Sequence, residues 1–224
     1  MADKKLVIGG KEIEIFGQNE KAPLVIFHAF DGEGEAVHAE LQKYTAVPYN
    51  LAVVNNLAWD DEMTPWPAPG LTKKMAPFKG EGKAYLQHLQ EEILPAVLKE
   101  LPDEPLYLCM AGYSLGGLFA LYAGYETDRF ARIASASGSL WYPGFREYAE
   151  KQKMGKTVQK VYVSLGDLES RTRNQYLRTV GENTEWFAEH LRSQGIETLF
   201  AWNEGNHQTD ADGRMARAIA AVLT

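Results

Sequence analysis

A serine between two glycines is the feature of this chain that most clearly indicates chemistry. Ser114 is the centre of a G-x-S-x-G sequence at 112–116. A strand-like apolar run at 106–110 precedes it and is expected to break at 111–112, and a helix-like apolar run at 118–122 follows. A sharp turn between a strand and a helix holds a serine in the open, where a base can take its proton. This context predicts a nucleophile elbow, and hence a serine hydrolase.

The same turn indicates where negative charge would be stabilised. Gly112 and Gly116 leave room that side chains beside Ser114 would otherwise fill. A helix that begins just after the serine points free backbone N–H groups at any oxyanion formed there. We expect the Leu115 N–H to be one donor of an oxyanion hole.

A second donor is expected from the loop after an earlier strand. The apolar run 23–27 reads as a strand buried on both faces. A glycine-rich turn follows it at 28–34. By position we assign the second donor to the N–H of Phe30, with Asp31 as the next candidate.

A serine nucleophile needs a base, and the chain has five histidines. In a parallel α/β sheet, catalytic groups collect at the carboxyl ends of the strands. His207 follows the last predicted strand in a glycine-containing loop and is the best candidate. His28 is the second candidate, although its place in the oxyanion loop favours a role in shaping the pocket. The other three, His38, His88 and His190, lie in helical patterns, where exposure or packing is the ordinary explanation.

The base in turn needs a carboxylate that holds it in the right tautomer. A predicted strand at 158–165 ends at Gly166, and two acidic residues, Asp167 and Glu169, follow it. We favour Glu169, because three residues past the glycine give it more reach toward the loop of His207. Asp167 remains the alternative, with a turn or helix-capping role as its ordinary explanation. The chain order serine, acid, histidine is the one expected of α/β-hydrolases.

Strands alternate with helices along nearly the whole chain. The predicted strands are 23–27, 51–54, 106–110, 130–136, 158–165 and 198–202, after an amino-terminal hairpin at 5–16; the predicted helices are 36–44, 83–101, 174–194 and 210–223. Pro95 should kink the second helix or end one segment of it. The pattern predicts an α/β fold: a mostly parallel sheet with helices on both faces, in one domain at 1–224 without a large cap domain.

One long segment, 55–82, has no regular period and is rich in proline and aromatic residues. Such a loop inside a compact domain is usually functional or disordered, and its two tryptophans favour an ordered loop over the active site. A surface wrap that packs on the core is the alternative. Trp141 and Tyr142 follow a strand end, and with Trp59 and Trp66 they are candidates for an aromatic acyl or alcohol pocket. A purely structural role is the alternative for Trp141.

Composition excludes several other classes of function. The chain has 30 acidic and 23 basic residues and a formal net charge of −7, and no Lys/Arg cluster forms a phosphate-binding stripe, so we expect no nucleic-acid partner. No apolar run approaches the 18 residues that a membrane-spanning helix needs, so we expect no membrane partner. The amino-terminal apolar run is also too short for a signal peptide. The single cysteine, Cys109, fits a reducing, cytoplasmic compartment. We expect no cofactor or metal, and the oligomeric state is open.

These residues resemble the putative-esterase (esterase D-like) family of the α/β-hydrolase superfamily. The resemblance runs from the strand at 23–27 to the carboxyl terminus, and its most specific points are 111–117, 135–141, 166–169 and 205–207. It implies an α/β-hydrolase fold with Ser114 as nucleophile, Glu169 as acid and His207 as base, because the acid of this family commonly falls three residues after the glycine. The oxyanion segment at 28–31 departs from the family's His-Gly-Gly type.

The expected reaction is the cleavage of a small-molecule ester in two steps. His207 takes the Ser114 proton, the N–H groups of Leu115 and Phe30 hold the oxyanion, and water cleaves the acyl-enzyme. One alternative is acyl transfer to an alcohol acceptor other than water. The other is a catalytically silent binding module with the same fold. An intact set of serine, acid and histidine argues against the second.

Overall fold

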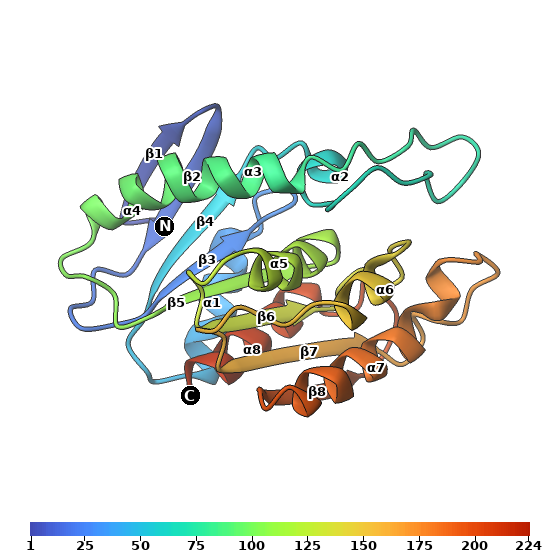
Figure 1. Cartoon of the computed structure of the whole chain (residues 1–224). Helices are drawn as coiled ribbons and strands as arrows, with labels where there is room; N and C mark the ends of the chain where they lie inside the picture. Colours follow the sequence, from blue (N-terminus) through green and yellow to red (C-terminus); the bar gives the residue numbers. More distant parts are fainter.

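The computed structural model describes residues 1–224 and is built on one eight-stranded sheet in the order β1-β2-β4-β3-β5-β6-β7-β8. The strands are β1 (Lys4–Ile8), β2 (Lys11–Phe16), β3 (Leu24–His28), β4 (Asn50–Asn55), β5 (Leu108–Tyr113), β6 (Arg132–Ala136), β7 (Lys160–Gly166) and β8 (Glu197–Asn203). Strands β3 to β8 run parallel to one another, whereas β2 pairs antiparallel with both β1 and β4. The predicted mostly parallel α/β sheet is confirmed (Figure 1).

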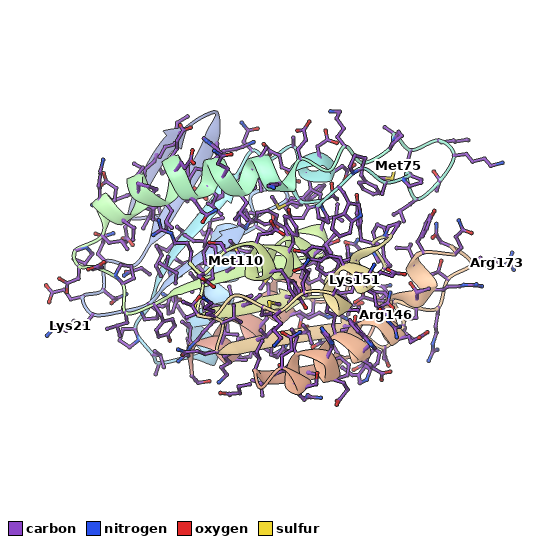
Figure 2. All side chains as sticks on the ribbon, in the orientation of Figure 1. Lys21, Met75, Met110, Arg146, Lys151 and Arg173 are labelled. Carbon is purple, nitrogen blue, oxygen red and sulfur yellow. The ribbon has the colours of Figure 1, made fainter.

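Helices cover both faces of the sheet. They are α1 (Gly34–Tyr44), α2 (Trp59–Glu62), α3 (Gly82–His88), α4 (Leu94–Glu100), α5 (Leu115–Glu126), α6 (Phe145–Glu150), α7 (Val180–Ser193) and α8 (Ala211–Leu223), with a 3₁₀ turn at Leu177–Thr179. One apolar cluster packs α1 and α8 on one face, and a second packs α3 to α7 on the other. Figure 1 shows α5 and α7 in front of the sheet and α8 behind it. In Figure 2, Met110 of β5 lies in the interior, whereas Lys21 and Arg173 project from the periphery.

The central strand β5 runs further than the sequence indicates. Instead of breaking at 111–112, it continues to Tyr113, because it pairs with β3 on one side and with β6 on the other through Gly112. The small residues there mark a close approach of helix α5. A Cβ on Gly112 would lie 2.2 Å from the carbonyl carbon and oxygen of Gly116. The break therefore falls at Ser114 itself.

The expected long helix at 83–101 is interrupted before Pro95. Between α3 and α4 the residues Leu89–Ile93 form one π-helical turn. Proline has no N–H to donate, and its ring collides with the carbonyl four residues earlier in a regular helix. A wider turn removes this collision without ending the helix. The prediction that Pro95 would disturb the helix is confirmed.

Two short helices lie where no helical period is visible in the sequence. They are α2, inside the segment 55–82, and α6, which follows Gly144. Helices of four and six residues are too short to show a repeated apolar stripe. Across the whole structure, no helix combines the length and the apolar character that crossing a membrane requires.

The contact between Gly112 and Gly116 generates a stability prediction. We expect Gly112→Ala to lower the free energy of unfolding by about 3 kcal/mol or more, because the overlap is with backbone atoms that cannot rotate away. Gly195→Ala is the control: Gly195 has φ +81° but nothing within 4 Å of its added Cβ, so the loss should be only about 1–2 kcal/mol. Urea unfolding measures both. Equal losses would contradict the steric account.

Candidate active site

The turn at Ser114 is strained and held on several sides. Ser114 lies between β5 and α5 with φ 56° and ψ −122°, which is unfavourable for a residue with a side chain. Its N–H donates to the carbonyl of Ala136 at 3.2 Å. Its own carbonyl accepts from the N–H groups of Gly117, Leu118 and Ser139 at 3.1, 3.1 and 2.9 Å. Strain of about 1–3 kcal/mol persists only where surrounding contacts over-determine the backbone, as they do here.

Three predicted side chains form one continuous line of hydrogen bonds. The Ser114 hydroxyl lies 3.0 Å from Nε2 of His207, and Nδ1 of His207 lies 2.7 Å from Oε2 of Glu169. They come from three carboxyl ends of strands: Ser114 after β5, Glu169 after β7 and His207 after β8. With Nδ1–H donating to Glu169, Nε2 is free to accept the serine proton.

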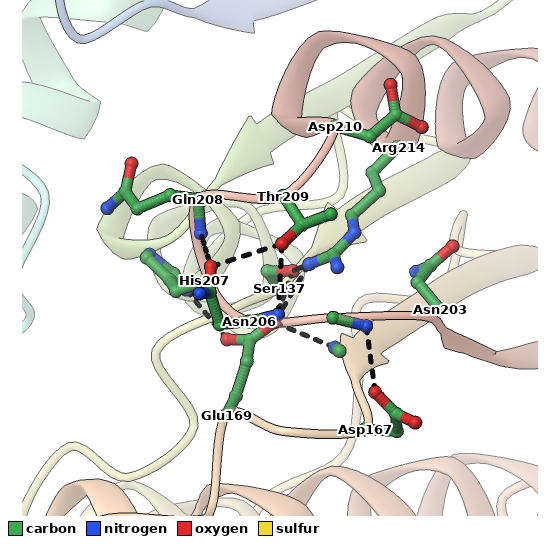
Figure 3. A network of polar contacts seen from close by, with 12 residues as sticks. Ser137, Asp167, Glu169, Asn203, Asn206, His207, Gln208, Thr209, Asp210 and Arg214 are labelled. Atoms are coloured by element: carbon green, nitrogen blue, oxygen red, sulfur yellow. Dashed lines mark hydrogen bonds and ion pairs between the residues drawn. The ribbon is translucent and has the colours of Figure 1, made fainter.

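Glu169 is fixed through its other oxygen, Oε1. That oxygen accepts from the Gly166 N–H at 2.7 Å, from the Ser137 hydroxyl at 2.8 Å and from Nη1 of Arg214 at 3.1 Å. The Arg214 side chain is fully buried and that of Glu169 is 5% exposed. Oε1 thus anchors the carboxylate to its surroundings, and Oε2 forms its hydrogen bond with His207 alone (Figure 3).

Sequence reasoning did not find Arg214. Its guanidinium also donates to the Glu204 carbonyl at 2.8 Å and to the Tyr113 hydroxyl at 3.3 Å. Arg214 lies in the second half of the first turn of α8, where an arginine reads as a solvent-facing residue. The available signal was its position near His207, since groups at the carboxyl edge of the sheet converge.

The electrostatic surroundings keep Glu169 ionised. Burial opposes this, but the hydrogen bonds from His207, from the Gly166 N–H and from Ser137 outweigh it and lower the pKa of Glu169 below its ordinary value of 4.5. Asp167, the alternative acid, does not contact His207. Its Oδ1 instead accepts from the Gly205 N–H at 2.8 Å, and Figure 3 shows its carboxylate directed at this backbone group.

The other candidate bases and nucleophiles lie elsewhere. His28 is completely buried against the rings of Tyr85 and Phe119, and burial lowers its pKa to about 3, so it is neutral. Burial raises the pKa of the Cys109 thiol to about 12, which makes it a poor nucleophile. No group of three His, Cys, Asp or Glu side chains is arranged to hold a metal ion.

The two expected oxyanion donors are in different states. The Leu115 N–H stands at the first position of α5, where a helix offers it no acceptor. The N–H groups of Phe30 and Asp31 both donate to the carboxylate of Glu33, each at 2.7 Å. The Ala29 N–H donates to the Val54 carbonyl at 3.0 Å and belongs to the sheet.

A cavity of about 430 Å³ opens beside Ser114. Its lining includes His207, Leu115 and three carboxylates. Its apolar side chains include Phe30, Trp59, Leu71, Met75, Phe78 and Trp141. The segment 55–82 supplies four of these six, and Figure 2 marks Met75 within it.

Of the four aromatic candidates for the pocket, Trp59 and Trp141 line this cavity, whereas Tyr142 and Trp66 do not. Tyr142 and Trp66 pack on each other beneath the segment 55–82, with ring centroids 6.3 Å apart. The Tyr142 hydroxyl donates to the Trp66 carbonyl at 2.6 Å, and Nε1 of Trp66 donates to the Pro143 carbonyl at 2.8 Å. These contacts fasten the segment to the loop after β6.

Comparisons with known proteins identify the family of this chain. The family model described as "Putative esterase" matches residues 25–214. The protein YbbA of Bacillus subtilis is 30% identical over 139 residues, which are 61% of this chain and 56% of that protein. An iron(III) enterobactin esterase of Dickeya dadantii is 39% identical over 66 residues, 28% of this chain and 15% of that protein. The chain thus spans about half or less of the length of these relatives.

Solved structures show the same fold. The siderophore hydrolase EstB from Aspergillus nidulans superposes with a TM-score of 0.76 at 16% identity, covering 98% of this chain and 93% of that one. The enterobactin esterase FES from Shigella flexneri, solved in the presence of enterobactin, gives a TM-score of 0.74 at 17% identity and covers 99% of this chain and 59% of that one. At these identities the likeness establishes the α/β-hydrolase fold alone.

The buried pair of Glu169 and Arg214 generates a pH-dependent prediction. We expect Glu169→Gln to lower the free energy of unfolding at pH 7 by about 3–5 kcal/mol, because it leaves a buried guanidinium without its counter-charge. The folded-state pKa of Glu169 is depressed, so its contribution to the free energy of unfolding is fully present above pH 4.5. This contribution is lost as the pH falls through the folded-state pKa.

The difference between wild type and variant should therefore shrink in acid. Urea unfolding at pH 7, 5 and 3 measures it. Asp167→Asn is the matched control, because Asp167 contacts only a backbone N–H of the loop. A loss for Glu169→Gln that stays constant across this range would contradict the assigned ionisation.

Proposed function

This chain belongs to the putative-esterase family, and from that premise we propose that it is a carboxylic ester hydrolase acting through an acyl-enzyme on Ser114. The observation that carries the proposal is the continuous path from the Ser114 hydroxyl through His207 to Glu169, with bonds of 3.0 and 2.7 Å. It is supported by the strained serine turn and by the cavity that opens on it. A nucleophile, a base and a group that orients the base are what acyl transfer requires.

In the first step, Nε2 of His207 removes the hydroxyl proton as Ser114 Oγ attacks the ester carbonyl. The C–O bond of the ester then breaks, and the imidazolium returns the proton to the departing alkoxide. In the second step, His207 takes a proton from water as the water oxygen attacks the acyl group on Ser114. The acyl–Oγ bond then breaks, the acid leaves, and the imidazolium returns its proton to Ser114 Oγ. Glu169 stabilises the imidazolium that forms in both steps.

The N–H groups of Leu115 and Phe30 are the proposed oxyanion donors. The Leu115 N–H comes from the first turn of α5, whose dipole adds partial positive charge. Loss of one such donor costs on the order of 100-fold or more in turnover. Arg214 acts on the reaction through Glu169, by holding that carboxylate so that its Oε2 faces His207.

The proposed substrate is a small-molecule ester with an apolar group beside the carbonyl. Trp59, Leu71, Met75, Phe78 and Trp141 give the cavity an apolar wall. We assign the segment 55–82 the role of flanking the active site, because Trp59, Leu71, Met75 and Phe78 of this wall come from it. A relative named as an iron(III) enterobactin esterase and a structural neighbour named as a siderophore hydrolase support ester cleavage as the reaction class.

Covalent labelling tests the mechanism. A fluorophosphonate probe should label the wild type and should fail to label Ser114→Ala, and kcat/KM for a short-chain aryl ester should fall by about 10⁴–10⁶-fold in Ser114→Ala and His207→Ala. Glu169→Ala should lose much of its activity, whereas Asp167→Ala should stay within a few fold, because its carboxylate does not face the histidine. A folded wild type that neither labels nor hydrolyses aryl esters would refute the proposal.

The charges of the cavity generate a prediction about substrates. Its charged walls are Glu33, Asp60 and Asp212, and no lysine or arginine lines it. An anionic group on the substrate would meet these carboxylates, so neutral aryl esters should have kcat/KM at least tenfold above isosteric esters bearing a carboxylate. Asp212→Asn should narrow that ratio, and Glu35→Gln, outside the cavity, should leave it unchanged. A preference for the anionic ester would contradict the prediction.

A further inference from the structure

The carboxylate of Glu33 occupies the N–H groups that the reaction needs. Glu33 immediately precedes α1 and reaches back along the chain, so that Oε1 accepts from the Phe30 N–H and Oε2 from the Asp31 N–H, both at 2.7 Å. These were the first and second candidates for the donor on this loop. The preceding N–H, of Ala29, is committed to the sheet through Val54. The loop thus presents both of its oxyanion candidates to its own side chain.

This contact lies on the side of the loop that faces the nucleophile. Glu33 and Phe30 line the same cavity as Ser114, Leu115 and His207. The Glu33 charge also reaches across the cavity to the start of α8: the pKa of Asp212 is raised first by burial and then by the negative charge of Glu33. Glu33 therefore lies at the solvent-accessible edge of the active-site cavity.

A carboxylate and an oxyanion cannot share one donor. The Phe30 N–H can point at only one of them, and two negative charges at hydrogen-bond separations repel each other strongly in a partly dry site. We propose that Glu33 blocks the oxyanion hole of the free enzyme: its carboxylate accepts from the Phe30 N–H, and an ester carbonyl must displace it before Ser114 can react. This proposal rests on the proposed function.

The surroundings allow the side chain to leave while the backbone stays. Glu33 is half-buried. The two backbone N–H groups are the only hydrogen-bond partners of its carboxylate, which forms no ion pair. The loop is held independently on both sides. The Ala29 N–H is bonded to β4, and Gly34 is packed so closely on Val53 that an added Cβ would lie 2.7 Å from that side chain. Rotation of Glu33 into solvent therefore frees the Phe30 N–H without dismantling the loop.

Kinetics of three variants test the proposal. Glu33→Ala should raise kcat/KM for a neutral aryl ester about tenfold, equivalent to ~1.4 kcal/mol of competition removed. Glu33→Gln keeps an acceptor but removes the charge, so it should give a smaller rise. Glu35→Ala is the matched control, because Glu35 is an exposed acid in the first turn of the same helix whose partner is the chain's amino terminus; its kcat/KM should equal that of the wild type. An unchanged or lower kcat/KM in Glu33→Ala would overturn the proposal.

A crystal structure of the wild type after phosphonylation supplies a readout that does not depend on how the variants fold. The phosphoryl oxygen should accept hydrogen bonds from the N–H groups of Leu115 and Phe30, with the Glu33 carboxylate displaced from Phe30. If Ser114 is phosphonylated but Glu33 still accepts from the Phe30 N–H, the proposed blocking role of Glu33 is refuted and the esterase mechanism stands. If the probe does not label Ser114 at all, both fall.

Discussion

The close contact between Gly112 and Gly116 is the constraint on which the rest of the site depends. It brings the first turn of α5 directly against the end of β5, and only then does the chain have to reverse within one residue. Ser114 takes the strained conformation because its flanking elements leave it no other. The same contact directs the first turn of α5 toward Ser114. One packing contact therefore positions both the Ser114 hydroxyl and the Leu115 N–H.

The pair of Glu169 and Arg214 has a different physical role from that of a stabilising salt bridge. Taking both charges out of water costs more than their attraction alone returns, unless hydrogen bonds satisfy the remaining atoms. Here the bonds from Gly166 and Ser137 satisfy the carboxylate, and the bond to the Glu204 carbonyl satisfies Nη2 of Arg214, whereas its Nε has no partner. The arrangement fixes the orientation of the Glu169 carboxylate. Its Oε1 accepts hydrogen bonds from Gly166, Ser137 and Arg214, and its Oε2 is left to bond with His207. A buried arginine that orients a carboxylate in this way contributes to reactivity rather than to net stability.

The sequence predicts the parts of this site that depend on chain order and fails for those that depend on packing. Ser114, Glu169 and His207 follow strands of a parallel sheet, and such a sheet brings the residues after its strands to one edge. Arg214 and Glu33 lie in or next to helices, where charged residues read as solvent-facing. Their inward direction is decided by how α8 and α1 pack on the sheet, which a periodic pattern does not reveal. Tertiary packing also decides the places of Trp66 and Tyr142. Their sequence positions suggested a pocket, but they fasten the segment 55–82 to the core.

The fold and the substrate are consequently determined by different parts of the chain. The sheet and the helices packed on it form a fold that proteins only 16–17% identical share over nearly the whole of this chain. The cavity wall comes instead from the segment 55–82, from the loop at Phe30 and from the first turn of α8. These are irregular or short pieces whose side chains can change without disturbing the sheet. A shared fold can therefore carry different cavity walls, and under the proposed function the choice of ester follows from the carboxylates and rings that this chain places around Ser114.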